Sequence, residues 1–259
     1  MKRYDAWSAD SGGRQRKAHP VQHTRLTRIS RRACAFAGPS LGRHSAPPGI
    51  DLLPPAARGA LAAAVRAGYT RIGFIDGAVE NASRLPLREL REVLATPGVE
   101  VLGGASMGAI RAAQLESAGM RGVGHVFRLF RRGSLVDSDE VYVLHAPAAL
   151  HYRCLTLPLV NVRYTLRSMR RSGHLAPADE RAIMQYMRGV PWFDRDRHSL
   201  SAAVYAVCGR LRCARVIQAF DCLYRDIKRD DALSLLSMLH RRFAFREMRR
   251  AIQCWTRTK

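Results

Sequence analysis

The sequence predicts an α/β fold: a Rossmann-like parallel sheet with flanking helices, followed by a mostly helical C-terminal region. Between residues 70 and 117, apolar strand-like segments alternate with helical segments, which is the order that a parallel sheet with right-handed crossovers requires. Beyond residue 120 the apolar residues follow a helical period. The chain has 259 residues, 47% of them hydrophobic, and is long enough to bury a core.

The first half of the chain supplies the expected strands. The run ACAFAGPSL at 33–41 predicts a strand that stops at a Gly-Pro turn. PPAARGALAAAVRAGY at 54–69 has proline at its start and glycine near its end, which indicates a helix. TRIGFID at 70–76 is apolar almost throughout, as in a strand covered on both faces. The amphipathic segment at 85–96 predicts a helix, and VEVL at 99–102 predicts the next strand.

The second half is predicted to be helical. The segments that carry this prediction are GVGHVFRLFRRG, LVNVRYTLRSMRRSG, PADERAIMQYMRG and DALSLLSMLHRRFAFREMRRAIQCW. Several of them end in arginine and glycine, which suit a helix C-terminus. We therefore expect a disordered basic extension at 1–32, an α/β core at 33–165 and a helical, Arg-rich region at 166–259. The extension is expected to be disordered because it lacks periodic apolar positions.

Composition limits the classes of function. The formal net charge of +22 comes almost entirely from arginine and lies mainly at the two ends of the chain, which predicts attraction to polyanions but no specific reaction. The chain has no zinc-finger spacing and no basic stripe interleaved with aromatic residues. Six scattered cysteines without a C-x-x-C pair indicate reduced thiols in a cytoplasmic protein, and no apolar run is long enough to span a membrane. No metal or cofactor is expected.

The turn GGASMG at 103–108 raises the main functional question. It satisfies G-x-S-x-G between a predicted strand and a predicted helix, the context in which Ser106 would sit in a strained turn as a nucleophile near helix amides. Two other interpretations stay open. The glycines could let the helix pack closely on the sheet with Ser106 as its N-cap, or the turn could hold an anion on the helix N-terminus.

Other polar residues could act with this turn. Asp76 closes a strand at the same edge of the predicted sheet, where ligands of open α/β folds bind, although an Asp-Gly pair also forms ordinary turns. Downstream, SLVDSDEVYVLHAP contains Asp139, Glu140 and His145, in the order serine, acid, histidine known from α/β-hydrolases. A structural histidine and a helix-capping acidic pair are the alternatives for these three residues. Glu89 alone would be read as part of a solvated helix face.

The blocks FAGPSL, GFIDGAVE and GGASMGAIRAAQLESAGMRGVGHVFRLFRRGSLVDSDEVYVLHAP resemble the TfuA-like family. They span residues 33 to 165, and the central block is long and specific. The resemblance implies a role beside a YcaO-type ATP-dependent cyclodehydratase in forming backbone thioamides in a precursor peptide or a protein. It also implies release of sulfide from the C-terminal thiocarboxylate of a ThiS-type ubiquitin-like sulfur carrier. Neither membrane nor nucleic acid is expected as a partner.

The resemblance assigns candidate residues. The catalytic candidates are Ser106 as nucleophile or oxyanion-site residue, His145 or Glu89 as general base, and Asp139 or Glu140 as orienting acid. The substrate-binding candidates match the family's motifs: Asp76, Gly77, Gly104, Ala105, Met107, Gly108, Arg111 and Arg121, with Arg111 as a clamp for an anionic tail. The chain departs from the family pattern at Ala60, Leu87, Gln114 and Ser138.

These departures leave three hypotheses. The first is a thiocarboxylate hydrolase. The second is a non-catalytic adaptor that binds and activates the YcaO partner or presents the sulfur donor. The third is a basic binder of nucleic acid or membrane surfaces with an inactive core.

Overall fold

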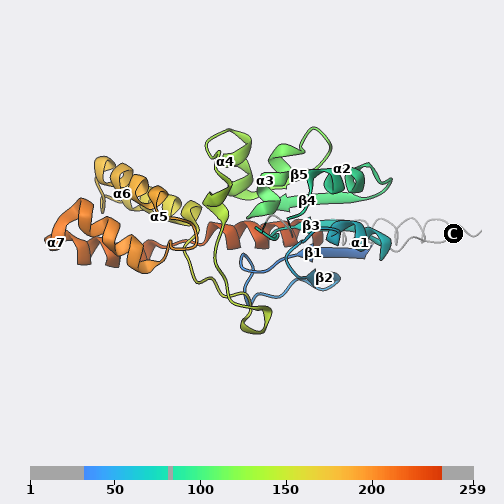
Figure 1. Ribbon diagram of the computed structural model, residues 1–259, viewed down its shortest axis with the longest axis horizontal. Coiled ribbons are helices and arrows are strands. Elements are labelled where there is room, and N and C mark those ends of the chain that lie inside the picture. Colours follow the sequence, from blue (N-terminus) through green and yellow to red (C-terminus); the bar gives the residue numbers. More distant parts are fainter. Residues whose placement is uncertain (1–31, 81–83, 241–259) are drawn as a thin grey trace, which may run out of the picture. The chain divides into compact units, whose positions relative to one another are not determined.

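A computed structural model describes residues 32–80 and 84–240 of the chain. Its first half alternates strands and helices: β1 (Arg32–Phe36), β2 (Ile50–Leu53), α1 (Ala60–Arg66), β3 (Tyr69–Phe74), α2 (Leu87–Ala95), β4 (Glu100–Gly104), α3 (Met107–Gln114), β5 (Arg121–Val123) and α4 (Gly124–Arg131). The remainder is helical: the 3-10 helices η1 (Ser138–Val141) and η2 (Ala148–Leu150), then α5 (Leu159–Arg171), α6 (Pro177–Gly189), α7 (Arg197–Leu223) and a helix at 227–240. This confirms the predicted fold class (Figure 1).

The five strands form one parallel sheet in the order β2-β1-β3-β4-β5. The chain direction across the sheet therefore reverses between β1 and β3, and this is the topological switch point of the flavodoxin-like strand order. In the register of these two strands Phe36 lies opposite Phe74, so β1 and β3 end side by side. A ligand site is expected just beyond these two strand ends.

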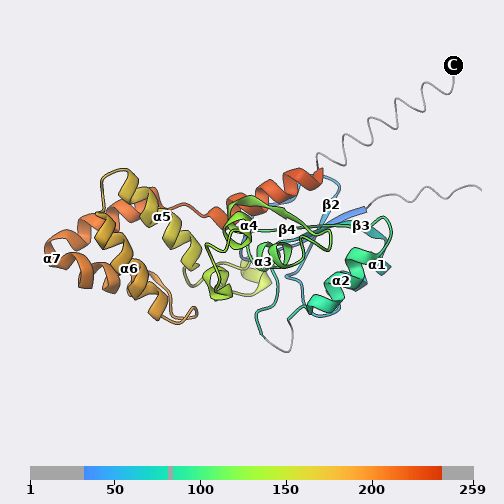
Figure 2. The same cartoon turned by 90° about the horizontal axis from the view of Figure 1, so that it is seen from above.

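Apolar residues cover both faces of the sheet. On one face, Ile72 and Phe74 of β3 belong to a buried cluster with residues of α1, α2, α3 and α4. On the other face, Leu102 of β4 packs with Leu235 and Leu239 of the 227–240 helix. Figure 2 shows α1, α2 and α3 on one side of the strands and this last helix, in red, on the other. A third buried cluster joins α5, α6 and α7.

Several elements differ from the prediction. The strands β2 and β5 and the helix α7 were not expected, and α1 begins at Ala60 rather than at Pro54. Its start is late because Ala56 is bound in extended conformation: its amide donates to the Asp76 carbonyl, and its own carbonyl accepts from the Ala78 amide, both at 2.9 Å. The extension predicted at 1–32 lies outside the described residues except for Arg32, which begins β1.

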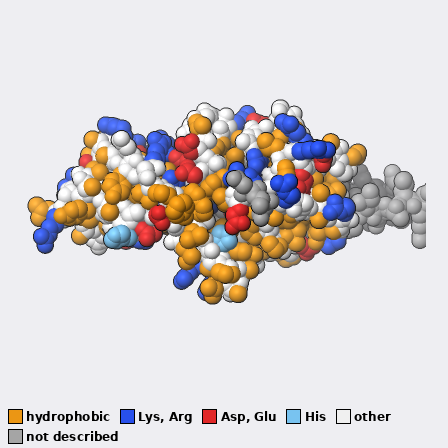
Figure 3. Space-filling model, in the orientation of Figure 1, with side chains coloured by type: hydrophobic (Ala, Val, Ile, Leu, Met, Phe, Trp, Pro, Cys, Tyr) orange, Lys and Arg blue, Asp and Glu red, His pale blue; other side chains and the backbone are white. Residues whose placement is uncertain are grey.

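Surface properties follow from this packing. On the face seen in Figure 3, Lys and Arg side chains are distributed among acidic and hydrophobic ones rather than gathered in one stripe.

Within residues 32–80 and 84–240, no helix combines the length and the apolarity that crossing a membrane requires. The described cysteines are free; Cys34 is buried, whereas Cys154 and Cys222 are exposed, and Cys254 lies outside the described residues.

The 227–240 helix carries a buried carboxylate that caps α4. Asp231 is 5% exposed and accepts hydrogen bonds from the amides of His125 and Val126 at 2.7 and 2.8 Å. Burial nevertheless raises the pKa of the Asp231 carboxyl from 3.8 to about 6. The folded state thus binds this proton more tightly than the unfolded state, so the stabilisation is complete below about pH 4 and is lost as the pH rises through about 6.

We therefore expect the free energy of unfolding of wild type to fall, relative to that of Asp231→Asn, by on the order of 2–3 kcal/mol between pH 4 and pH 7. Urea unfolding at a series of pH values measures the difference. Asp230→Asn, which removes the partly exposed partner of Arg225, serves as control and should follow the wild-type curve. Parallel curves for wild type and Asp231→Asn would contradict the prediction.

Candidate functional site

The candidate site begins at the switch point, where Asp76 follows β3. Its Oδ2 accepts hydrogen bonds from the amides of Gly38 and Ser40 at 2.8 and 2.9 Å, and its Oδ1 accepts one from the Ser40 hydroxyl at 2.6 Å. Asp76 is only 2% exposed, so these three donors replace water around the carboxylate. The carboxylate thereby fixes the loop after β1 against the end of β3.

The glycine-rich turn after β4 has a different geometry from a strained nucleophile turn. The residue with positive φ is Ala105, at 63°, whereas Ser106 has a φ of −127°. Ser106 occupies the N-cap position of α3, but its side chain makes no capping hydrogen bond. Instead its hydroxyl lies 3.5 Å from the Val141 carbonyl, a long contact. The positive φ expected at the serine of a nucleophile turn therefore lies one residue earlier, at Ala105.

Close packing accounts for the glycines of this turn. A Cβ on Gly108 would lie 1.7 Å from the carbonyl oxygen of Phe74, and one on Gly103 would lie 2.2 Å from that of Gly108. The amide of Gly108 donates to the Ile75 carbonyl at 3.1 Å, so this helix amide is engaged with β3 rather than with a ligand. The turn brings α3 against the end of β3, as the packing interpretation proposed.

A small cavity, here called the serine cavity, brings four of the candidate residues together. Its lining includes Asp76, Gly77, Ser106, Tyr142 and His145, and its volume is about 20 Å³. That volume holds about one water molecule. Ser106 itself is 6% exposed.

His145 is the exposed member of the site, and its hydrogen bond defines the tautomer of its ring. The residue is exposed, and its ring makes an edge contact with Tyr152 at 5.7 Å. The Nδ1 atom lies 2.9 Å from the Ala146 carbonyl, which can only accept, so Nδ1 carries the proton. Nε2 is then the ring atom that can accept a proton.

The two acidic candidates of η1 point to other partners. Asp139 pairs with Arg195 at 2.7 Å, and Glu140, 3% exposed, pairs with Arg163. Both acids line a different cavity, together with Arg188, and neither lines the serine cavity. These ion pairs attach η1 to the helical region. The acid that lies near Ser106 and His145 is Asp76.

Glu89 and Arg121 also lie away from the serine cavity. Glu89 caps α1, accepting from the amides of Gly59 and Ala62 at 2.7 and 3.2 Å. Arg121 begins β5, at the opposite end of a parallel strand from the site, and pairs with Glu100 at 2.8 Å.

Met107 and Arg111 lie outside the lining of the serine cavity. Met107 is buried in the core that contains Phe74. Arg111 donates to Gln114 Oε1 at 2.8 Å and to the Leu85 carbonyl at 3.3 Å. Burial and then the neighbouring Arg84 lower the pKa of the Arg111 guanidinium.

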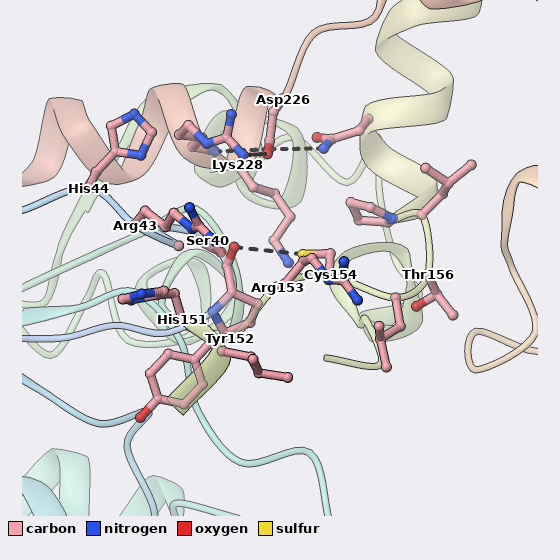
Figure 4. Close-up of a pocket in the computed structure, with 18 of the residues that line it drawn as sticks. Ser40, Arg43, His44, His151, Tyr152, Arg153, Cys154, Thr156, Asp226 and Lys228 are labelled. Atoms are coloured by element: carbon pink, nitrogen blue, oxygen red, sulfur yellow. Dashed lines mark hydrogen bonds and ion pairs between the residues drawn. The ribbon is translucent and has the colours of Figure 1, made fainter. Parts of the chain in front are cut away.

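Two polar residues at this edge did not appear among the sequence candidates. Ser40 binds Asp76, and Lys228, at the start of the 227–240 helix, donates to the Val141 carbonyl at 2.6 Å. Ser106 and Lys228 are therefore neighbours, because both contact the same oxygen atom. Figure 4 shows the Lys228 side chain extending toward Cys154 and Ser40. One signal was available: Lys228 is the only lysine between residues 18 and 258 of this arginine-rich chain.

Comparisons with known proteins identify a family that this chain resembles. Among the described residues, no group of three His, Cys, Asp or Glu side chains could hold a metal ion. A search of curated proteins gave no significant match. Residues 76–196 match the model of a family described as TfuA-like protein, and this range begins at Asp76 and includes Ser106, η1 and His145. Over this range the chain is similar to the TfuA-like family.

Proposed function

We propose that this chain releases sulfide from the C-terminal thiocarboxylate of a ThiS-type sulfur carrier, for use by a YcaO-type enzyme that forms thioamides in a peptide. Similarity to the TfuA-like family over residues 76–196 supports a role in YcaO-associated thioamidation with a YcaO partner. The observation that carries the hydrolytic proposal is the serine cavity, where a hydroxyl, an imidazole and a carboxylate line one space at the switch point.

The reaction is acyl transfer to water: R–COS⁻ and H₂O give R–COO⁻ and H₂S. In the proposed reaction the Ser106 hydroxyl attacks the acyl carbon, Nε2 of His145 accepts the proton and passes it to the departing sulfur, and water then hydrolyses the resulting seryl ester to the carboxylate. In the direct alternative, a water molecule beside Ser106 attacks and its proton follows the same route. The hydroxyl must leave the Val141 carbonyl to do so, and the long 3.5 Å contact makes that change inexpensive. The orienting role expected of Asp139 or Glu140 falls to the Ala146 carbonyl, which faces Nδ1 of His145, while Asp76 lines the same cavity and holds the loop after β1.

A second candidate function is a non-catalytic adaptor that binds and activates the YcaO partner or presents the sulfur donor. The size of the serine cavity favours it, because about 20 Å³ does not admit an acyl chain. Hydrolysis thus requires the segment around His145 to move when the carrier binds. An adaptor requires no such movement.

The Ser106→Ala variant tests the hydrolytic proposal. We expect sulfide release from a thiocarboxylated ThiS-type carrier to fall about 100-fold or more, the scale for loss of a nucleophile or an oxyanion donor. The measurement is the initial rate of sulfide formation, with the carrier alone as blank. Ser134→Ala, at an exposed position on the loop before η1, is the matched control and should keep the wild-type rate.

The same assay separates the two candidate functions. If wild type releases sulfide no faster than the blank with several carriers, the hydrolytic proposal fails. Thioamide formation by the YcaO enzyme is then measured with and without this chain, with free sulfide supplied. A rate increase that Ser106→Ala preserves would establish the adaptor.

A further inference from the structure

A larger pocket lies next to the serine cavity and has a cationic lining. Its volume is about 510 Å³, and it shares Pro39 with the serine cavity. The charged residues of its lining are five cations and one carboxylate: Arg43, Arg153, Arg197, Lys228, Arg229 and Asp226. We call it the basic pocket; Figure 4 shows its interior.

The charges of this pocket are not balanced within the described part of the chain. Arg229 pairs with Asp226 at 3.0 Å, and Arg197 pairs with Asp221. Lys228 is 2% exposed and has a neutral backbone carbonyl as its hydrogen-bond acceptor, with no ion pair to any described carboxylate. A buried ammonium without a direct ion-pair partner is costly, and a bound anion would lower that cost through charge-assisted hydrogen bonds. The ligand class is therefore anionic.

The rim of the pocket indicates a macromolecular ligand. The loop at 144–155 folds back on itself: the Leu155 amide donates to the Leu144 carbonyl at 2.8 Å. Three leucines of this loop are well exposed, Leu144 at 44%, Leu150 at 57% and Leu155 at 47%, and the last two line the pocket. Figure 3 shows hydrophobic side chains on this loop, which is olive in Figure 1. A small free anion would leave these leucines in water, whereas a partner's apolar surface would cover them.

We propose that the basic pocket receives the extended carboxyl-terminal tail of a partner protein, with Lys228 facing the terminal carboxylate or thiocarboxylate and the 144–155 loop contacting an apolar patch beside the tail. The volume lies in the range of pockets for small ligands, about 300–1,000 Å³, so it accommodates a few small residues but no folded domain. The inference rests on the proposed function, in which that partner is the sulfur carrier. It assigns the entry route to the Ser106 neighbourhood, because Lys228 and Ser106 contact the same carbonyl.

Binding of synthetic peptides tests this assignment without any reaction. The probes are a short fluorescein-labelled peptide ending in Gly-Gly with a free carboxylate and the same peptide with a terminal amide, followed by fluorescence anisotropy. We expect the carboxylate form to bind wild type about tenfold more tightly or better, the scale of one charge-assisted hydrogen bond. Lys228→Met, which keeps the length of the side chain, should remove that preference. Arg43→Ala, at an exposed position of the lining, should weaken binding of both peptides.

The controls distinguish this inference from the proposed function. Arg91→Ala changes an exposed arginine of α2, outside the basic pocket, and should leave binding unchanged. Equal binding of the two peptides, or a preference that survives in Lys228→Met, would overturn the inference. If inorganic phosphate displaces the carboxylate peptide, and if shorter and longer peptides bind with equal affinity, the inference would also be overturned, in favour of a site for small anions. Selective binding without sulfide release would refute only the hydrolysis, whereas release that is unaffected in Lys228→Met and Arg43→Ala would refute only the pocket.

Discussion

Replacing Arg195 by alanine is expected to lower the free energy of unfolding by about 3 kcal/mol or more. The guanidinium is almost fully buried and donates to the backbone carbonyls of Met187, Val190 and Asp139, as well as to the Asp139 carboxylate. Alanine would remove these hydrogen bonds together and open a cavity in their midst. Urea unfolding followed by circular dichroism measures the change.

The same substitution should also reduce sulfide release, because Arg195 positions η1. Val141, the last residue of η1, presents the carbonyl that contacts both Ser106 and Lys228. Arg212→Ala is the matched control: this arginine pairs with Asp179 on the surface, where an ion pair contributes little, so unfolding and activity should stay close to wild type. Unchanged stability in Arg195→Ala would show that the helical region holds η1 by other contacts.

The elements that the sequence predicted well are those with long apolar runs and clear ends. The strand at 70–76 and the amphipathic helix at 85–96 became β3 and α2 with small changes of boundary. The edge strand β2 escaped prediction because its sequence, IDLL, is largely exposed and is interrupted by a charge. The strand β5 escaped because three residues, RGV, carry no periodicity.

The candidate site was predictable where topology alone determines position. Asp76 and Ser106 each follow the end of a parallel strand, so the parallel order was enough to place them at one edge. The environments of Asp139 and Glu140 were not predictable in this way. Closeness to His145 in the chain suggested a shared site, but η1 turns both acids toward arginines of the helical region. Those arginines come from segments whose packing the sequence pattern does not specify.

The position of Lys228 beside Val141 could not be predicted from the sequence. It lies 87 residues beyond Val141 and reaches it because the 227–240 helix returns to cover the second face of the sheet. In the sequence that helix is one of several arginine-rich amphipathic segments, with no pattern that indicates which surface it covers. The residue that completes the candidate site is thus supplied by the tertiary fold.

Gly108→Ala is expected to be as destabilising as the loss of Arg195, lowering the free energy of unfolding by about 3 kcal/mol or more. The new methyl carbon would lie 1.7 Å from the Phe74 carbonyl oxygen and 2.5 Å from its carbon. Both are backbone atoms of a central strand, so no side chain can rotate away, and α3 must shift. That shift would also break the hydrogen bond from the Gly108 amide to Ile75 and displace Asp76, the next residue along the chain.

Urea unfolding of Gly108→Ala measures the stability, and sulfide release measures the effect on the site. Gly189→Ala is the control, since a methyl group there meets no atom within 4 Å and alanine is tolerated or mildly stabilising where the backbone permits it. An unfolding midpoint of Gly108→Ala equal to that of wild type would mean that α3 does not need its close approach to β3. The glycine-rich turn would then require an explanation other than packing, and ligand contact at Ser106 would be the first to reconsider.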